Sequence, residues 1–99
     1  MTVSHVHEDG TYPRPSDDVV ARRLDDVVVL INLKTNRMFE LNSTGARLWE
    51  LIVAGSKDAE VRETMLREFD VSETELTTAI DSLTSWLVSE GLIGNGSGA

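Results

Sequence analysis

The 99-residue chain contains no cysteine. This absence excludes disulfide bonds, thiol catalysis and zinc sites built on thiolates. No apolar run approaches the roughly 20 residues that cross a bilayer. The N-terminus also lacks the basic flank and apolar core of a signal peptide. We therefore expect a cytoplasmic protein with no membrane partner.

Basic residues are scarce: 9 Lys and Arg stand against 17 Asp and Glu, for a net charge of −8. Proteins that bind nucleic acids draw much of their affinity from Lys and Arg on phosphates. Nothing after Arg67 is basic. The composition thus disfavours a nucleic-acid partner and is compatible with a neutral or basic polypeptide.

No group of residues suggests catalysis or metal binding. Both histidines, His5 and His7, stand in a polar N-terminal stretch, where a Ser-His-Asp arrangement could not be held. No glycine-rich phosphate loop is present. Asp25 and Asp26 are adjacent, and nothing near them in the sequence would raise the pKa of either. We predict that the protein is not an enzyme, with no catalytic residues, metal site or cofactor.

The length is typical of one domain. Residues 1–18 are polar and contain Gly10, Pro13 and Pro15, so we expect a flexible N-terminal arm. Residues 94–99, GNGSGA, are expected to form a flexible tail. The folded domain is predicted to span residues 19–93.

Three short segments are predicted to be strands, 19–24, 27–33 and 38–41, and the exposed edge of the last is taken to begin at Arg37. The second, VVVLINL, is rich in β-branched residues and is expected to be central. The connections are too short for crossovers, which indicates an antiparallel meander. Asn36 is the best candidate for left-handed geometry in the second turn.

Three helices are predicted to follow. The first begins at Asn42 or Ser43 and ends at Gly55, and the second covers about 56–68. The third starts with the capping box Ser72 to Glu75 and ends at Gly91. The positions expected to be buried are Leu48, Trp49, Ile52, Val53, Val61, Met65, Leu66, Phe69, Leu76, Ile80, Leu83 and Leu87. The fold class is α+β, a three-stranded antiparallel sheet followed by three helices in a winged helix-turn-helix-like layout.

The third strand is expected to have a free edge over residues 37–41. Such an edge invites pairing unless it is protected, and this segment has no proline. A peptide could add to it as a further strand. A second copy could instead pair with it edge to edge, or the N-terminal arm could cover it. A winged-helix regulator that contacts DNA is disfavoured because the third helix has no basic residue.

The text Leu41-Asn42-x-Thr44-Gly45-Ala46-x-x-Trp49, preceded by Leu30-Ile31-Asn32-Leu33-x-Thr35-x-Arg37, resembles the PqqD-like family, also called RiPP recognition elements. The resemblance extends over about residues 20–93. It implies a non-catalytic domain that binds the leader of a ribosomally synthesised precursor peptide. The leader would add beside the third strand, pack on the third helix, and be presented to a modifying or processing enzyme.

The resemblance favours a lasso-type system, in which a partner leader peptidase removes the leader. Two alternatives are a PqqD-type chaperone of pyrroloquinoline quinone biosynthesis and a winged-helix regulator acting through DNA or protein contacts. The expected partners are the precursor peptide and the leader peptidase or another modifying enzyme, and the expected state is a monomer or weak homodimer. Asp81 would meet a basic leader residue. The predicted peptide-binding residues are Arg37, Met38, Phe39, Glu40, Leu41, Leu76, Ile80, Asp81, Leu83 and Thr84.

Overall fold

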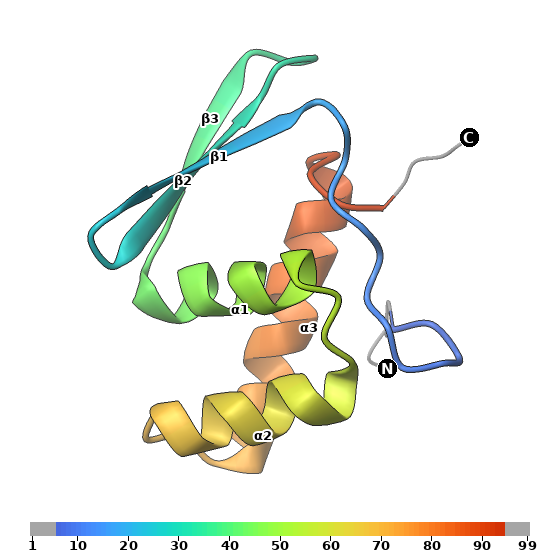
Figure 1. The fold of residues 1–99 in the computed structure, drawn as a ribbon, viewed down its shortest axis with the longest axis vertical. Helices are drawn as coiled ribbons and strands as arrows, with labels where there is room; N and C mark the ends of the chain where they lie inside the picture. Colours follow the sequence, from blue (N-terminus) through green and yellow to red (C-terminus); the bar gives the residue numbers. More distant parts are fainter. Residues whose placement is uncertain (1–5, 95–99) are drawn as a thin grey trace.

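The computed structural model describes residues 6–94, which form three strands followed by three helices (Figure 1). The elements are β1 (Val19–Leu24), β2 (Val27–Asn32), β3 (Arg37–Leu41), α1 (Ser43–Val53), α2 (Asp58–Glu68) and α3 (Glu73–Ser89). This is the α+β arrangement that the sequence predicts. Within the described part of the chain, no helix combines the length and the hydropathy that a membrane span requires.

The sheet is an antiparallel meander in the order β1-β2-β3. Its two turns each contain a residue in left-handed geometry, Asp25 with φ 57° and Asn36 with φ 61°. Short polar side chains tolerate this conformation better than branched ones. The prediction for Asn36 is therefore confirmed.

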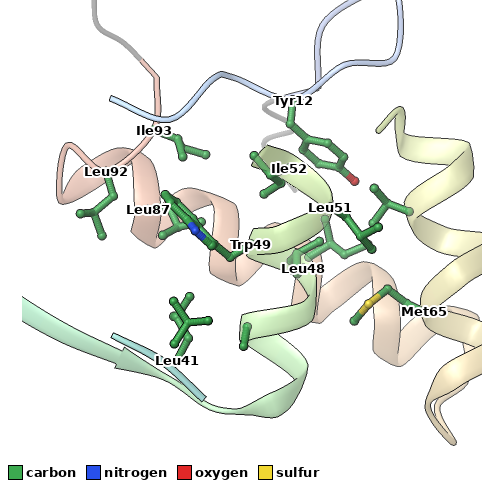
Figure 2. Packing of buried hydrophobic residues seen from close by; sticks show 14 of the residues in the cluster. Tyr12, Leu41, Leu48, Trp49, Leu51, Ile52, Met65, Leu87, Leu92 and Ile93 are labelled. Atoms are coloured by element: carbon green, nitrogen blue, oxygen red, sulfur yellow. The ribbon is translucent and has the colours of Figure 1, made fainter. Parts of the chain in front are cut away.

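Alternate residues of β2 point to opposite faces of the sheet, and the buried ones are Val28, Leu30 and Asn32. All three helices lie on the side of the sheet that these residues face (Figure 1). Leu30 belongs to a core that also takes apolar side chains from all three helices and from the C-terminal segment. Its labelled members in Figure 2 are Tyr12, Leu41, Leu48, Trp49, Leu51, Ile52, Met65, Leu87, Leu92 and Ile93.

The helix boundaries follow local capping chemistry. Asn42 caps α1, since its Oδ1 accepts a hydrogen bond from the N–H of Gly45 at 2.9 Å. The capping box of α3 is present as predicted. Helix α2 begins later than expected, because the Glu60 side chain accepts from the N–H of Lys57 and makes that residue the cap.

Val53 was expected on the buried stripe of α1, and this expectation is wrong. Its side chain is 55% exposed. Val53 is the last residue of α1, where the chain turns away through Gly55, so no neighbouring element covers it.

Residues 6–18, here called the N-terminal strap, pack on the domain, whereas the sequence suggested a loose arm. Tyr12 is 5% exposed, and its hydroxyl donates a hydrogen bond to Asp58. Further along, the N–H of Ser16 donates to the carbonyl of Leu92 at 3.0 Å. The strap therefore joins the start of α2 to the segment after α3. Residues 1–5 and 95–99, with His5 and nearly all of the predicted tail, lie outside the described residues.

The Tyr12 hydroxyl belongs to a partly buried polar chain. Arg62 donates to Asp58 at 2.9 Å and to the hydroxyl of Thr77 at 2.7 Å, so the chain connects strap, α2 and α3. Burial, followed by the hydrogen bond to Asp58, raises the pKa of Tyr12 above its ordinary value of 10.0. The protonated phenol is thus the form that the fold stabilises.

We expect Tyr12→Phe to lower the free energy of unfolding by about 1–2 kcal/mol at neutral pH, because Asp58 loses one buried donor. The unfolded chain releases the phenol proton above about pH 10 while the folded chain retains it, so wild-type stability should fall as pH rises through that range. The variant lacks this term. Urea denaturation at pH 8 and pH 10.5 should show that the difference in free energy of unfolding between wild type and variant is smaller at the higher pH. An unchanged difference would contradict the role given to the hydroxyl.

Candidate peptide-binding edge

The outer edge of β3 directs main-chain groups toward solvent. The N–H of Leu33 donates to the carbonyl of Asp18, next to β1, at 2.8 Å. Because main-chain direction alternates along a strand, the N–H groups of Val28, Leu30 and Asn32 point toward β3. Their partners are Leu41, Phe39 and Arg37. The remaining residues of β3, Met38 and Glu40, therefore direct their N–H and C=O groups away from the sheet.

This edge is open in the described chain. The sheet has three strands and β3 is its last, and the side chains of Met38 and Glu40 are exposed. The strap, which was one candidate to cover the edge, lies instead beside α2 and the segment after α3. Two N–H groups and two C=O groups are therefore available to a further strand.

The inner side of β3 is fastened to α3. The rings of Phe39 and Trp86 meet edge to face with centroids 4.9 Å apart. The guanidinium of Arg37 lies 5.2 Å from the Phe39 ring centroid and forms an ion pair with Glu90 at 2.8 Å. Arg37 is 60% exposed, so this ion pair adds little stability. Its effect is to hold the start of β3 beside the C-terminal half of α3.

A small apolar pocket lies where β3 gives way to α1. It has a volume of about 200 Å³ and is walled by the start of α1, one residue of α2 and the N-terminal half of α3. An added Cβ at Gly45 would lie 3.4 Å from Asn42 Oδ1, in van der Waals contact with the cap of α1. The lining residues are Asn42, Thr44, Gly45, Leu48, Met65, Leu76, Ala79, Ile80 and Leu83.

One face of α3 connects this pocket with the aromatic contact. Ala79, Leu83 and Trp86 are spaced by four and three residues and therefore share a helix face. Ala79 is exposed, and Leu83 and Trp86 are half-buried. We call these three residues the α3 rim. The open edge of β3 and the α3 rim together offer hydrogen bonds on one side and apolar surface on the other.

The predicted site residues divide into two groups. Arg37 to Leu41 form β3, as expected, and Leu83 lies on the α3 rim. Leu76 and Ile80 are each 2% exposed, so they form the pocket wall and contribute mainly to the core.

Asp81 and Thr84 lie away from the rim. Thr84 is 2% exposed, and its hydroxyl donates to the carbonyl of Ile80 at 2.8 Å. Asp81 lies within electrostatic range of Tyr12 and Arg62. At 100° per residue, Asp81 is about 140° around the helix from Trp86. Asp81 therefore lies on the flank of α3 away from Trp86, and this placement does not support the prediction that Asp81 meets a basic leader residue.

Ala79 and Trp86 were missing from the predicted site. Trp86 lies one position from Leu87 on the buried stripe of α3, and the structure shows it half-buried. Ala79 gave no signal, because a small residue in a helix is compatible with any environment.

Asn32 is a further residue whose role the sequence did not indicate. It is 3% exposed, and its side-chain amide donates to the carbonyl of Glu90 at 3.0 Å. Its Oδ1 accepts from the N–H groups of Lys34 at 2.9 Å and Thr35 at 3.3 Å. Asn32 thus orders the turn before β3 and ties that turn to the end of α3.

Other concave surfaces offer less. One cavity, of about 740 Å³, lies between the strap and the C-terminal end of α1, and polar strap residues such as His7, Arg14 and Asp17 line part of it. Residues 6–94 contain no cluster of three His, Asp or Glu side chains that could hold a metal ion. The β3 edge is therefore the best candidate site, and its chemistry is that of binding.

Comparison with known proteins agrees with this geometry. No curated protein matches the chain. A solved structure of "TbiB1 in Complex with the TbiA(beta) Leader Peptide" is 27% identical, with a TM-score of 0.78, over 86% of this chain and 99% of that chain. "Lasso peptide synthetase B1 complexed with the leader peptide" is 22% identical, with a TM-score of 0.76, over 83% and 96% of the two chains, and this likeness supports the fold. The family described as coenzyme PQQ synthesis protein D (PqqD) matches residues 28–93, two thirds of the sequence, and the chain belongs to this family.

Proposed function

We propose that the protein is a non-catalytic adaptor that binds the leader of a ribosomally synthesised precursor peptide and presents it to a processing or modifying enzyme. The observation that carries the proposal is the open edge of β3 beside the α3 rim. A peptide in extended conformation would pair with the main chain of Met38 and Glu40. Its inward side chains would then contact Leu83 and Trp86.

The relatives support a lasso-type assignment. The structural neighbour at 27% identity was solved with a leader peptide, and the chain covers nearly all of it. The enzyme partner that best suits this assignment is a leader peptidase acting in the cytoplasm. A chaperone role in pyrroloquinoline quinone biosynthesis is the alternative within the same family.

The geometry suggests how a leader would be recognised. Main-chain pairing is independent of sequence, so selectivity must come from side chains that alternate along the added strand. The pocket of about 200 Å³ can take one apolar side chain of the leader. A short interface of this kind is expected to have a Kd between about 1 nM and 1 µM.

The test is a fluorescence anisotropy titration of labelled leader peptides, taken from precursor genes encoded beside this one. Saturable binding is expected for one leader and none for the same residues in scrambled order. Absence of binding to every neighbouring leader would overturn the proposal. Trp86 provides a second readout, because its half-buried indole adjoins the edge while Trp49 is buried.

A pair of charge changes on α3 tests which flank binds. Ala79→Glu places a carboxylate on the exposed rim, and we expect it to weaken leader binding about tenfold or more through desolvation of the new charge. Asp81→Ala, on the other flank, should leave the Kd within about twofold. Circular dichroism should show that both variants are folded. A stronger effect at Asp81 than at Ala79 would place the leader on the wrong side of the helix for strand addition to β3.

A further inference from the structure

The sheet has a second surface, on the side away from the helices, which we call the outer face. No helix of the described chain covers it (Figure 1). Strand alternation and register place nine side chains there. They are Val20, Arg22, Leu24, Val27, Val29, Ile31, Leu33, Met38 and Glu40.

The outer face is unusually apolar for a surface in contact with water. Of the five exposed large apolar side chains in residues 6–94, four belong to it: Val20 at 39%, Leu24 at 57%, Leu33 at 57% and Met38 at 68%. Isolated apolar residues on a surface are ordinary, whereas a contiguous apolar patch marks an interaction site. Seven aliphatic side chains on one uncovered sheet therefore point to a protein partner.

The two charged residues of this face have a symmetric placement. Arg22 pairs with Val29, and Val29 pairs with Glu40, so the three side chains form one row across the sheet. Neither Arg22 nor Glu40 forms an ion pair within the described residues. Neighbouring strands are about 5 Å apart, which leaves this row with a positive end, an apolar centre and a negative end.

A row of this kind is complementary to itself. When two sheets pack face to face about a two-fold axis that runs along β2, Val29 meets its own copy. The same rotation brings Arg22 of one protomer opposite Glu40 of the other, twice. In the adjacent row, Val20 comes opposite Met38 and Ile31 meets its own copy. A rotation axis across the strands would instead oppose Arg22 to Arg22.

We propose that the outer face is a homodimer interface, with two sheets packed face to face and two symmetric pairs between Arg22 and Glu40. Three short strands bury an area near the lower limit of specific interfaces, about 1,000–1,200 Å² in total, so the dimer is weak, with a Kd on the order of 100 µM. The arrangement differs from edge-to-edge pairing, because it leaves the main chain of Met38 and Glu40 free. It does not depend on leader binding.

Sedimentation velocity between about 10 µM and about 1 mM, at about 0.15 M salt, tests the proposal. Arg22→Glu and Glu40→Arg each oppose like charges, and each should raise the dimer Kd about tenfold or more. The double variant keeps the wild-type net charge and restores both pairs, so its Kd should return to within about threefold of wild type. Arg67→Glu is the matched control, since it changes net charge as Arg22→Glu does but lies on exposed α2 surface.

Two results would overturn the dimer. One is a monomer throughout this concentration range, which would leave the outer face to a different protein, such as the enzyme that acts on the precursor. The other is a dimer that the double charge exchange fails to restore, which would place self-association on another surface. Leader titration of the wild-type and Arg22→Glu proteins, which keep the β3 edge unchanged, is independent, so failure of the dimer and failure of leader binding are distinguishable.

Discussion

Proline at Met38 or at Glu40 is expected to weaken leader binding about a hundredfold while leaving the domain folded. The N–H groups of these two residues point away from β2, so their loss does not interrupt the ladder that holds β3 in the sheet. An added strand would lose a donor and meet the pyrrolidine ring. We expect a loss of about 2–3 kcal/mol, which is about a hundredfold in Kd.

The opposite edge of the sheet provides a matched control. By the same alternation, Ala21 of β1 directs its N–H group away from β2. Ala21→Pro should therefore place the same pyrrolidine ring on the β1 edge of the sheet and leave the Kd for the leader unchanged. Anisotropy titrations of the three variants, together with thermal unfolding, separate the two effects. Equal losses at Ala21 and Met38 would indicate that proline acts through the fold, and strand addition to β3 would be contradicted.

The sequence was sufficient for the elements and their order, because each carries local chemistry of its own. The β-branched run of β2 and the capping box Ser72 to Glu75 are short-range signals that tertiary context had no reason to override. Asn42 and Asn36 likewise occupy conformations that their own side chains favour. Fold class and the free β3 edge followed from these residues alone.

The sequence was insufficient where a residue's role depends on a distant partner. Tyr12 stands among polar neighbours, and its burial and its hydrogen bond to Asp58, 46 residues away, are what show that the strap is docked. Asp81 and Trp86 are five residues apart on one helix, and their opposite flanks depend on which side of α3 meets the sheet. Periodicity identifies the buried stripe, but it does not say which neighbour lies on either side of the stripe.

The roles of Tyr12 and Asp81 were missed because they depend on distant partners, and the candidate site depends on distant partners in the same way. A strand-addition site has few side chains of its own, since its main contacts are backbone groups that every residue carries. Sequence motifs such as Leu41-Asn42-x-Thr44-Gly45 therefore report the turn from β3 into α1, including the Asn42 cap, which accepts a hydrogen bond from the N–H of Gly45. They identify the family through its scaffold, while the binding surface depends on how β3 and α3 are held side by side.

Asn32 ties the turn before β3 to the end of α3, and Asn32→Ala should lower the free energy of unfolding by about 2–4 kcal/mol. The substitution removes three hydrogen bonds in a site that is 3% exposed, and it leaves the carbonyl of Glu90 without this donor. The turn before β3 and the end of α3 should then separate more readily. Since Arg37 and Glu90 flank this point, leader affinity should fall as well.

Urea denaturation measures the change in the free energy of unfolding. Leader titration under conditions where the variant is folded measures the change in leader affinity. Asn36→Gly is the control, because Asn36 lies in the same turn, is exposed and has φ 61°, which glycine adopts without strain. We expect it to change stability by less than about 0.5 kcal/mol and the Kd by less than twofold. If Asn32→Ala lowers stability but leaves the Kd unchanged, the contact between Asn32 and Glu90 supports the fold alone. If stability and leader affinity fall together, the position of β3 beside α3 is itself a determinant of leader binding. That position would then depend on a buried amide that lies outside the proposed leader contacts.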